Sequence, residues 1–306
     1  MGSNMEDLIR LEAFNWLKEQ TMIHGDVLPR KLLEEGFEFN GQKITLIGPK
    51  GIWKPRVFKK VPLSITTVYN GPYDDSITGD GFLQYRYRGI DPFHGDNVGL
   101  REAMKNQIPL IYFYGIVPGK YLAVWPVYII NDNPASLTFT IAADDVSTIE
   151  RHLLSSHNII VSDTSEIAVR KYITSSVRQR LHQKAFRERV LLAYSQQCAF
   201  CRIKHIQLLD AAHIIPDGDE LGDPVVNNGL SLCKIHHAAF DSNIIGVTPD
   251  YIIEVREDIL NEKDGPMLKH GIQELQHKKI ILPRDKKMWP DRERLYIKYT
   301  KFKQTG

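Results

Sequence analysis

The sequence predicts an α+β protein with two domains: a strand-rich first part and a smaller second part braced by a metal ion. Three observations predict this. The chain has 306 residues, enough for two ordinary domains. Its first half reads as short strands separated by turns, and a long segment without Pro or Gly then predicts a helix. All three cysteines lie after that segment, and two of them are three positions apart, a spacing typical of metal ligands.

The composition describes a globular chain rather than a disordered one, with 42% hydrophobic and 25% charged residues. The formal net charge is only +2, so a nucleic-acid partner would have to bind a local basic surface. Three cysteines do not suit a secreted disulfide framework, and we expect a reducing, cytoplasmic compartment. The first residues, MGSNMEDLIRLEAF, turn amphipathic at once, and we expect no signal peptide.

Helix and turn signals organise the start of the chain. An apolar residue recurs every three positions from Leu8 to Leu17, which predicts a helix. The segment LPRKLLEE predicts a second, short helix that ends at Gly36, because glycine commonly follows the last residue of a helix. Asn40-Gly41 within FEFNGQKITLI predicts a β-hairpin.

The most apolar segment is PLIYFYGIVPGKYLAVWPVYII, from Pro109 to Ile130. It is long enough to raise the question of a membrane span. Pro118, Gly119 and Pro126 interrupt it, however, so two buried strands joined by a Pro-Gly turn are the better interpretation. The segment SLTFTIAADD closes this first region.

A basic segment from Ser165 to Gln197 contains neither Pro nor Gly and predicts a long helix. Both a solvated surface helix and a helix lying along a phosphate backbone fit its charge. In the second case Arg178, Lys184 and Arg187 are the candidate DNA contacts.

These features divide the chain into residues 1–160, a basic helical linker at 161–197, and residues 198–306. The last part ends in a second basic stretch, where a helix is expected to start near Pro290. We expect its aromatic residues to pack rather than to stack on bases.

Two pairs of potential metal ligands lie in the last part. Cys198 and Cys201 form Cys-x-x-Cys, and Cys233 and His236 form Cys-x-x-His. Together they supply four ligands for a tetrahedral zinc ion, which leaves no open position and is therefore structural. Such a zinc would fasten a small domain with little core of its own. His205 is an alternative fourth ligand, although an exposed histidine is its simpler interpretation.

His213, in DAAHIIP, is followed by Asn228 and His237 in NNGLSLCKIHHAAFD. His237 and Asp241 are four residues apart, so both lie on one face of a helix. A strand His, a turn Asn and a helix His beside two zinc half-sites resemble the HNH endonuclease family. The resemblance covers roughly residues 190–257 and implies a core of two strands and a helix, the ββα-metal fold, around one catalytic metal ion.

The chemistry expected from this resemblance is phosphodiester hydrolysis. A neutral imidazole such as His213 can take a proton from water at neutral pH. His237 and Asp241 can hold a divalent cation, and Asn228 is implied to brace the loop that orients His213.

One position departs from the family pattern. Many members place a metal ligand directly before the general base, where this chain has Ala212. Asp210 lies on the same strand face as Ala212, so we expect either its carboxylate or water to fill the gap. Mg²⁺ or Mn²⁺ would suit one carboxylate plus water, whereas a transition metal such as Co²⁺ or Ni²⁺ would suit the imidazole.

The first region is expected to choose the target. GDGFLQYRYRGIDPFHGDN and the apolar segment that follows resemble a PUA-like barrel, the superfamily that includes SRA readers of modified cytosine. Such readers flip a base into an aromatic pocket. Two clusters are the candidate DNA contacts, with burial in the barrel core and ordinary surface charge as the simpler interpretations: Trp53 with Arg56, and the alternating Tyr85, Arg86, Tyr87 and Arg88. The N-terminal helices and hairpin also fit a small winged-helix-like module.

The whole arrangement resembles bacterial HNH restriction endonucleases, including modification-dependent ones. Double-stranded DNA, with or without modified bases, is the expected partner. One HNH site cuts one strand, so a double-strand break requires two copies, and we expect a homodimer. Two other functions stay open: a zinc-stabilised DNA-binding module whose nuclease site has decayed, and a nuclease specific for RNA or for a nucleic-acid structure.

Overall fold

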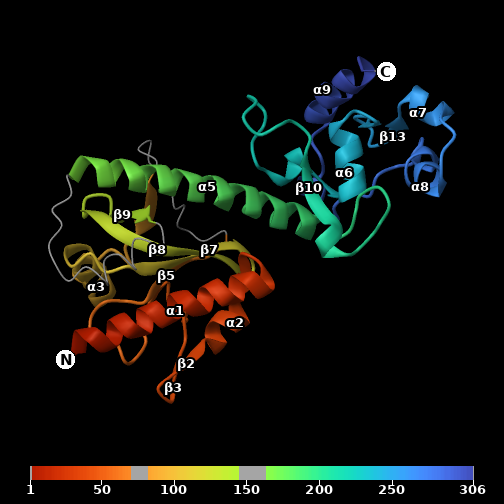
Figure 1. Ribbon diagram of the computed structural model, residues 1–306. Helices are drawn as coiled ribbons and strands as arrows, with labels where there is room; N and C mark the ends of the chain where they lie inside the picture. The colour runs from red at the N-terminus through yellow and green to blue at the C-terminus, as the bar shows by residue number, and fades with distance from the viewer. Residues whose placement is uncertain (1, 70–81, 145–162, 306) are drawn as a thin grey trace. The chain divides into compact units, whose positions relative to one another are not determined.

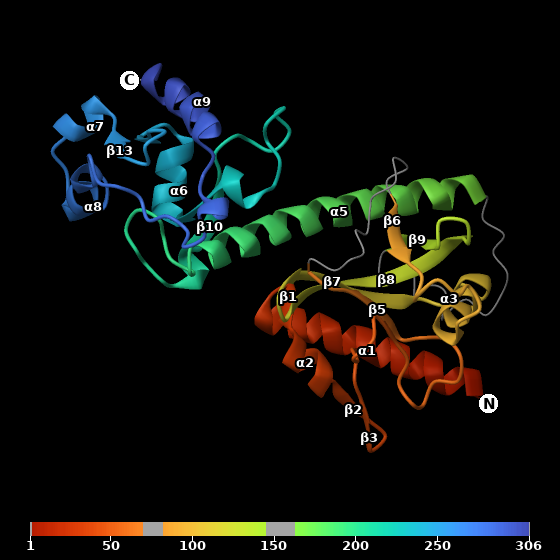
Figure 2. The same cartoon turned by 180° about the vertical axis from the view of Figure 1, so that it is seen from behind.

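A computed structural model describes residues 2–69, 82–144 and 163–305 of the chain. The chain forms two compact units, Met1–Leu181 and His182–Gly306. Their elements are drawn in Figure 1, with labels on most of them, and seen from behind in Figure 2. The boundary between the units falls inside one helix, α5 (Asp163–Ala193). The division into residues 1–160, 161–197 and 198–306 stays a prediction.

The first unit is a mixed structure rich in strands. Within the described residues its main sheet has seven strands, in the order β4-β5-β7-β8-β9-β6, with β1 paired to β8. Neighbouring strands are antiparallel except for β5 and β7, which are parallel. The strands are β1 (Val27–Pro29), β4 (Ile52–Trp53), β5 (Ser64–Thr67), β6 (Leu83–Arg86), β7 (Leu110–Val117), β8 (Lys120–Asn133) and β9 (Thr138–Ala143).

This sheet curls so that strands from its two ends meet. Three strands separate β5 from β6 in the sheet order, which would place them about 19 Å apart in a flat sheet. The hydroxyl of Tyr85 in β6 nevertheless donates to the carbonyl oxygen of Thr66 in β5 at 3.4 Å. The first unit is therefore a strand-rich half-barrel. The start of the segment that suggested a PUA-like barrel, residues 79–81, lies outside the described residues.

The N-terminal helices cover one face of the sheet, as Figure 1 shows. They are α1 (Gly2–His24) and α2 (Arg30–Glu35), and α3 (Gly95–Lys105) follows β6. Phe14 and Leu17 of α1 are buried in one cluster with Ile111 and Phe113 of β7. The first helix is confirmed, and this segment belongs to the core of the first unit rather than to a separate winged-helix-like module.

The turn predictions in this unit are also confirmed. Strands β2 (Phe37–Phe39) and β3 (Gln42–Ile44) form the expected hairpin. Its two turn residues, Asn40 and Gly41, have φ values of 48° and 75°, the left-handed conformations that a two-residue hairpin turn requires. The apolar segment forms β7 and β8, joined at Pro118-Gly119.

Helix α5 begins in the first unit and confirms the predicted long helix. The Thr174 hydroxyl accepts a hydrogen bond from the Ala143 amide at 2.9 Å, at the end of β9. Arg170 pairs with Asp144, with Nε and Oδ2 3.0 Å apart. These contacts attach the first half of α5 to the sheet.

The second unit is built on a small hairpin and the helix that follows it. In the hairpin Leu209 pairs with Cys233 and His213 with Gly229. Its core includes Phe186 and Val190 of α5 together with Leu230, Leu232 and Phe240. The elements are β10 (Leu209–His213), β11 (Gly229–Cys233), α6 (Lys234–Asp241), β12 (Ile245–Val247), β13 (Ile253–Val255), α7 (Glu257–Asn261), α8 (Pro266–Gly271) and α9 (Arg292–Lys303).

The last helix has the predicted start, with Asp291 as its N-cap residue. Its aromatic residues differ from one another. Phe302 is buried and Tyr299 donates to Glu254 Oε2 at 2.6 Å, whereas Tyr296 is 62% exposed. The packing interpretation therefore holds for two of these three side chains.

Within the described residues, no helix is long and apolar enough to cross a membrane.

Candidate active site

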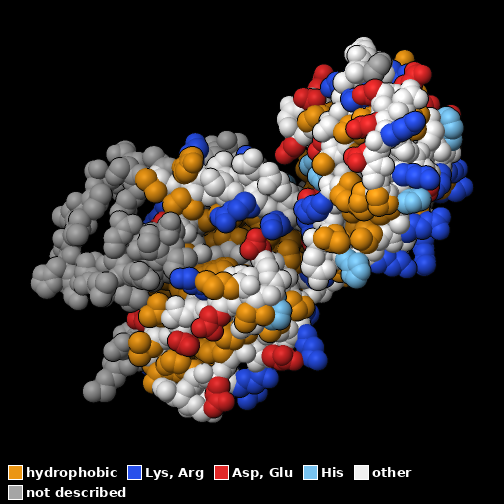
Figure 3. Space-filling model, turned by 45° about the vertical axis from the view of Figure 1, so that its right-hand side comes forward, with side chains coloured by type: hydrophobic (Ala, Val, Ile, Leu, Met, Phe, Trp, Pro, Cys, Tyr) orange, Lys and Arg blue, Asp and Glu red, His pale blue; other side chains and the backbone are white. Residues whose placement is uncertain are grey.

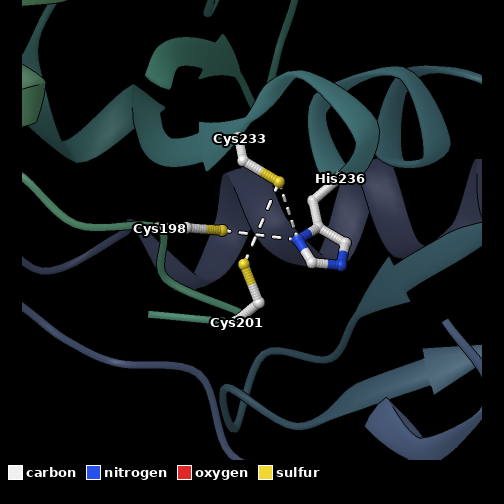
Figure 4. A group of neighbouring side chains, drawn as sticks. All are labelled: Cys198, Cys201, Cys233 and His236. Atoms are coloured by element: carbon white, nitrogen blue, oxygen red, sulfur yellow. Dashed lines mark hydrogen bonds between the residues drawn. The ribbon is translucent and has the colours of Figure 1, made fainter. Parts of the chain in front are cut away.

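Four side chains of the second unit gather at one point, as Figure 4 shows. They are Cys198, Cys201, Cys233 and His236, whose ligand atoms all lie within 4.8 Å of one another. His236 Nδ1 is 3.4 Å from Cys198 Sγ and 3.2 Å from Cys233 Sγ, and Cys201 Sγ is 3.9 Å from Cys233 Sγ. Zinc–sulfur bonds of 2.3 Å give a tetrahedron with edges of about 3.8 Å, so the four donors fit a zinc ion.

The surroundings of His236 favour the same use. Its Nε2 donates to the carbonyl oxygen of Gly271 at 2.7 Å, which leaves the Nδ1 lone pair facing the sulfurs. The thiols of Cys198 and Cys201 hold the pKa of the Cys233 thiol well below its usual range. His205 is exposed, and the group of four does not include it.

The hairpin and α6 carry the other three predicted residues. His213 ends β10, Asn228 directly precedes β11, and His237 lies on α6 beside His236. Gly229 faces His213 in the hairpin register. A Cβ added at Gly229 would lie 2.5 Å from Val190 Cγ2, so only glycine lets α5 approach the hairpin this closely.

Asn228 is fully buried and holds the backbone that follows His213. Its Oδ1 accepts from the amide of Ile215 at 2.9 Å, and its Nδ2 donates to the carbonyl oxygen of Ile215 at 3.0 Å. Nδ2 also donates to the carbonyl oxygen of Asp223 at 3.1 Å. These bonds tie two points of the loop between β10 and β11, at Ile215 and Asp223, to one side chain.

His237 lies between two carboxylates. Its Nε2 is 3.2 Å from Asp241 Oδ2, and its Nδ1 is 3.7 Å from Asp210 Oδ2. The carboxylates of Asp210 and Asp241 raise the pKa of His237 to about 9. The carboxylate of Asp241, and the imidazole of His237 once a cation displaces a proton from it, are donors that a divalent cation can use.

Asp210 has cations around it. Lys234 Nζ is 2.8 Å from its Oδ2, and Arg187 Nε is 3.6 Å from its Oδ1. Burial raises the pKa of Asp210, but His237 and Lys234 outweigh it and hold the pKa well below its usual range. Its predicted role as a metal ligand stays a prediction.

His213 is half-buried and stacks on Phe186, with ring centroids 4.0 Å apart and an interplanar angle of 16°. Its Nε2 is buried and has no hydrogen-bond partner within the described part of the chain. Burial lowers the pKa of His213, and the carboxylates of Asp217 and Asp241 oppose that effect. The imidazole is thus kept neutral and able to accept a proton.

A cavity of about 340 Å³ opens in the first unit between β5 and β6. Four of the predicted reader residues line it, namely Tyr85, Arg86, Tyr87 and Arg88. The two tyrosines are buried and Arg86 is exposed, as the alternation predicts. Thr66 also lines the cavity, and its Oγ1 is buried without a hydrogen-bond partner among the described residues.

The other residues predicted to contact DNA differ in their burial and in their contacts. Trp53 is half-buried, and its Nε1 donates to the carbonyl oxygen of Thr45 at 2.9 Å, whereas Arg56 is exposed. Arg178 and Lys184 are half-buried on α5, and Arg187 contacts β10. The predicted DNA contacts of all these residues stay predictions.

Sequence reasoning missed Thr66 and Phe186. A threonine on a strand and a phenylalanine on a helix are ordinary core residues, and no local pattern marks either. Only the tertiary structure brings Thr66 to the cavity and Phe186 to the face of His213.

Comparisons with known proteins agree with the geometry of the second unit. Residues 198–248 match the family model described as "HNH endonuclease". No curated protein matches the sequence. A solved structure titled "Modification dependent TagI restriction endonuclease" is 16% identical, covering 79% of this chain and 82% of that chain, with a TM-score of 0.28. The family match covers the cysteine and histidine pairs, His213, Asn228, His237 and Asp241. Residues 198–248 therefore form an HNH endonuclease domain.

Proposed function

We propose that the protein is a metal-dependent DNA endonuclease of the restriction type, in which the second unit cuts DNA and the first unit reads it. One observation carries this proposal. Strand β10, which packs against α6, ends in His213, whose Nε2 is buried without a hydrogen-bond partner among the described residues. On α6, His237 Nε2 lies 3.2 Å from Asp241 Oδ2. A neutral base beside donors for a divalent cation is the combination that phosphodiester hydrolysis needs.

His213 is the proposed general base, which takes a proton from the attacking water. Its lowered pKa supports this role, because a neutral imidazole is the form that accepts a proton. Asn228 is the proposed brace, since its hydrogen bonds to Ile215 hold the chain two residues after the base.

His237 and Asp241 are the proposed ligands of the catalytic cation. Their side chains are 24% and 57% exposed, which leaves room for water and a phosphate oxygen. When bound there, a divalent cation offsets the charge on the phosphate and on the leaving 3′ oxygen. Mg²⁺ and Mn²⁺ are the first candidates, followed by Co²⁺ and Ni²⁺. The contacts of Asp210 with Lys234 and Arg187 favour a role for it other than metal ligand.

The cavity between β5 and β6 is the proposed site for a base flipped out of the duplex. Tyr85 and Tyr87 offer aromatic surface, and Thr66 Oγ1 offers a polar group without a described partner. Exposed Arg86, at the rim, can approach a flanking phosphate. A modified cytosine is the proposed ligand, as the resemblance to PUA-like and SRA readers implies.

The second unit also offers a basic surface. Figure 3 shows Lys and Arg side chains gathered along one edge of it. With a net charge of only +2 for the whole chain, such local clustering is what contact with a phosphate backbone requires.

A second function is favoured by one observation, the alanine at position 212, where a metal ligand is common in the family. In that case the protein would bind DNA without cutting it. Intact His213, Asn228 and His237 argue against such decay.

Cleavage of matched plasmids tests the proposal. Wild type and His213→Ala would be incubated with Mg²⁺, Mn²⁺, Co²⁺ or Ni²⁺ and with unmodified, cytosine-methylated, hydroxymethylated or adenine-methylated plasmid. We expect wild type alone to cut, and only a cytosine-modified plasmid. Cutting of every plasmid would refute the proposal that the first unit recognises modified cytosine. Binding without cutting under all conditions would refute the assignment of this site as a nuclease.

Binding to short duplexes tests the cavity separately. We expect wild type to prefer a duplex with one modified cytosine, and Thr66→Val to lose that preference while keeping its fold. Thr138→Val, a change in β9 away from the cavity lining, is the control. An unchanged preference in Thr66→Val would remove Thr66 from the proposed site.

A homodimer on DNA is part of the same proposal, because two nuclease sites are needed to cut both strands. Sedimentation of the protein on a cleavable duplex should show two copies. A monomer that cuts both strands in one encounter would contradict this.

A further inference from the structure

Two consecutive residues of α5 contact the strand that carries the proposed general base. One of them contacts His213 itself, and the other contacts Asp210, which faces the proposed metal ligand His237. Phe186 and Arg187 precede the segment that matches the HNH model, residues 198–248, so the family match says nothing about them. Phe186 contacts His213, and Arg187 contacts β10 and Asp210.

Phe186 covers one face of the general base. Its ring is only 2% exposed and lies nearly parallel to the imidazole, at 16°. An added Cβ at Gly229, the partner of His213 in the hairpin, would lie 2.9 Å from Phe186 Cζ. The phenyl ring is thus wedged against the hairpin, and rotation of the His213 ring out of its plane would collide with it.

Arg187 ties down the start of the strand that carries His213. One of its terminal nitrogens, Nη2, donates to the carbonyl oxygens of Leu209 at 2.9 Å and Ile206 at 3.3 Å. The same side chain places Nε 3.6 Å from Asp210 Oδ1. Its other terminal nitrogen, Nη1, pairs with Glu188 Oε1 at 2.9 Å, and the side chain as a whole is 28% exposed.

Asp210 passes this restraint on to the proposed metal ligand. Its Oδ2 faces Nδ1 of His237 at 3.7 Å, the ring edge opposite the one that faces Asp241. Asp210 is thus the outer partner that can keep a proton on Nδ1 when Nε2 gives up its own proton to bind a cation. Lys234, at 2.8 Å, holds the same Asp210 oxygen from another side.

We propose that Phe186 and Arg187 are positioning residues of the nuclease: Phe186 fixes the plane of His213, and Arg187 holds Asp210 where it orients His237. This inference rests on the proposed nuclease function. It differs from two simpler roles, namely packing of α5 for stability alone and contact of Arg187 with DNA.

The test compares Phe186→Leu, Arg187→Met and Arg187→Lys with wild type. The controls are Leu191→Val, which trims a buried side chain of the same helix and core, and Arg180→Met, which removes a positive charge from an exposed position of the same helix. Thermal unfolding, Mn²⁺ affinity without DNA, DNA affinity without added metal, and kcat and KM would be measured for each.

We expect Phe186→Leu to lower kcat at least tenfold, with Mn²⁺ affinity and KM little changed. Arg187→Met should weaken Mn²⁺ binding about tenfold, the lower end of the loss expected when the outer partner of a metal ligand, here Asp210, is displaced. Arg187→Lys should restore part of that loss, whereas Leu191→Val and Arg180→Met should keep the wild-type Mn²⁺ affinity.

Other outcomes overturn the proposal. If Leu191→Val and Phe186→Leu lose kcat in proportion to equal losses of thermal stability, Phe186 serves packing alone. If Arg187→Met loses DNA affinity but keeps Mn²⁺ affinity and kcat, Arg187 is a DNA contact. Mn²⁺ affinity is measured without DNA, so a wild type that binds Mn²⁺ but cuts nothing refutes the nuclease proposal while still testing Arg187. A wild type that binds no Mn²⁺ refutes both.

Discussion

His236 and His237 are neighbours on one helix and belong to opposite kinds of site. His236 is 3% exposed and faces three cysteine sulfurs. His237 is 24% exposed and faces the carboxylates of Asp210 and Asp241. Successive helix residues point about 100° apart, so one short helix can serve two sites at once.

The contrast lies in how many positions each site leaves open. Four protein donors close the first site, so a metal ion there can only stabilise the fold. Two donors leave the second site open to water and a phosphate oxygen, so a cation there can take part in chemistry. Substitutions in the closed site should therefore unfold the second unit. Substitutions in the open site should slow cleavage and leave the fold intact.

The largest effect is expected for Cys198→Ser. Loss of one of four donors should release zinc and unfold the second unit, because binding of a structural metal contributes directly to folding. Zinc content and thermal unfolding measure this. His205→Ala, an exposed histidine near the same pair, should keep both. A Cys198→Ser protein that melts like wild type would refute the structural zinc.

The next effect is expected for His213→Ala. Removal of a general base typically costs 10²- to 10⁴-fold in rate, so plasmid cleavage should fall by at least about 100-fold. DNA affinity and zinc content should remain, because the imidazole Nε2 has no hydrogen-bond partner within the described residues. Cleavage at more than about a tenth of the wild-type rate would remove His213 from the role of base.

A smaller effect on stability and cleavage is expected for Asn228→Ala, and Asn227→Ala is its control. Asn228→Ala should lower the free energy of unfolding by about 1–3 kcal/mol, because it leaves the buried amide and carbonyl of Ile215 without their hydrogen-bond partner. It should also slow cleavage. Asn227 donates to the carbonyl oxygens of Lys287 and Trp289, both at 2.8 Å, so Asn227→Ala should cost stability without slowing cleavage. Equal slowing by both variants would mean that Asn228 acts through stability alone.

The smallest predicted effect is a displaced titration. Burial lowers the pKa of His213, so its imidazole should lose its proton below the ordinary value of about 6.5. The neutral base is then present throughout the range above that midpoint. NMR titration of the protein without added divalent metal measures it, with the resonance assigned by its absence in His213→Ala. A midpoint above 6.5 would contradict the assigned burial effect.

The zinc site and the hairpin formed by β2 and β3 could be predicted from sequence, because each accepts only a few residue types. Cysteine and histidine pairs at short spacing are the typical ligands of a structural zinc ion, and the chain has no other cysteines. Asn40-Gly41 likewise predicts its hairpin, because few residue pairs accept two positive φ values.

The remaining features depend on tertiary structure. The cavity forms where the curled sheet brings β6 near β5, although Thr66 and Tyr85 are 19 positions apart and three strands separate them in the sheet. The contacts of Phe186 and Arg187 arise where α5 crosses the hairpin, and any helix with a phenylalanine and an arginine has the same local pattern. No periodicity in the sequence carries that information.

The most direct test of the contrast between the two sites compares His236→Ala with His237→Ala. Each protein would be assayed for zinc content, thermal unfolding of the second unit and plasmid cleavage with added divalent metal. We predict that His236→Ala loses zinc and the folded second unit, and that His237→Ala keeps both but cuts no plasmid. Loss of zinc in His237→Ala, or full cleavage by it, would contradict the assignment of one closed and one open site.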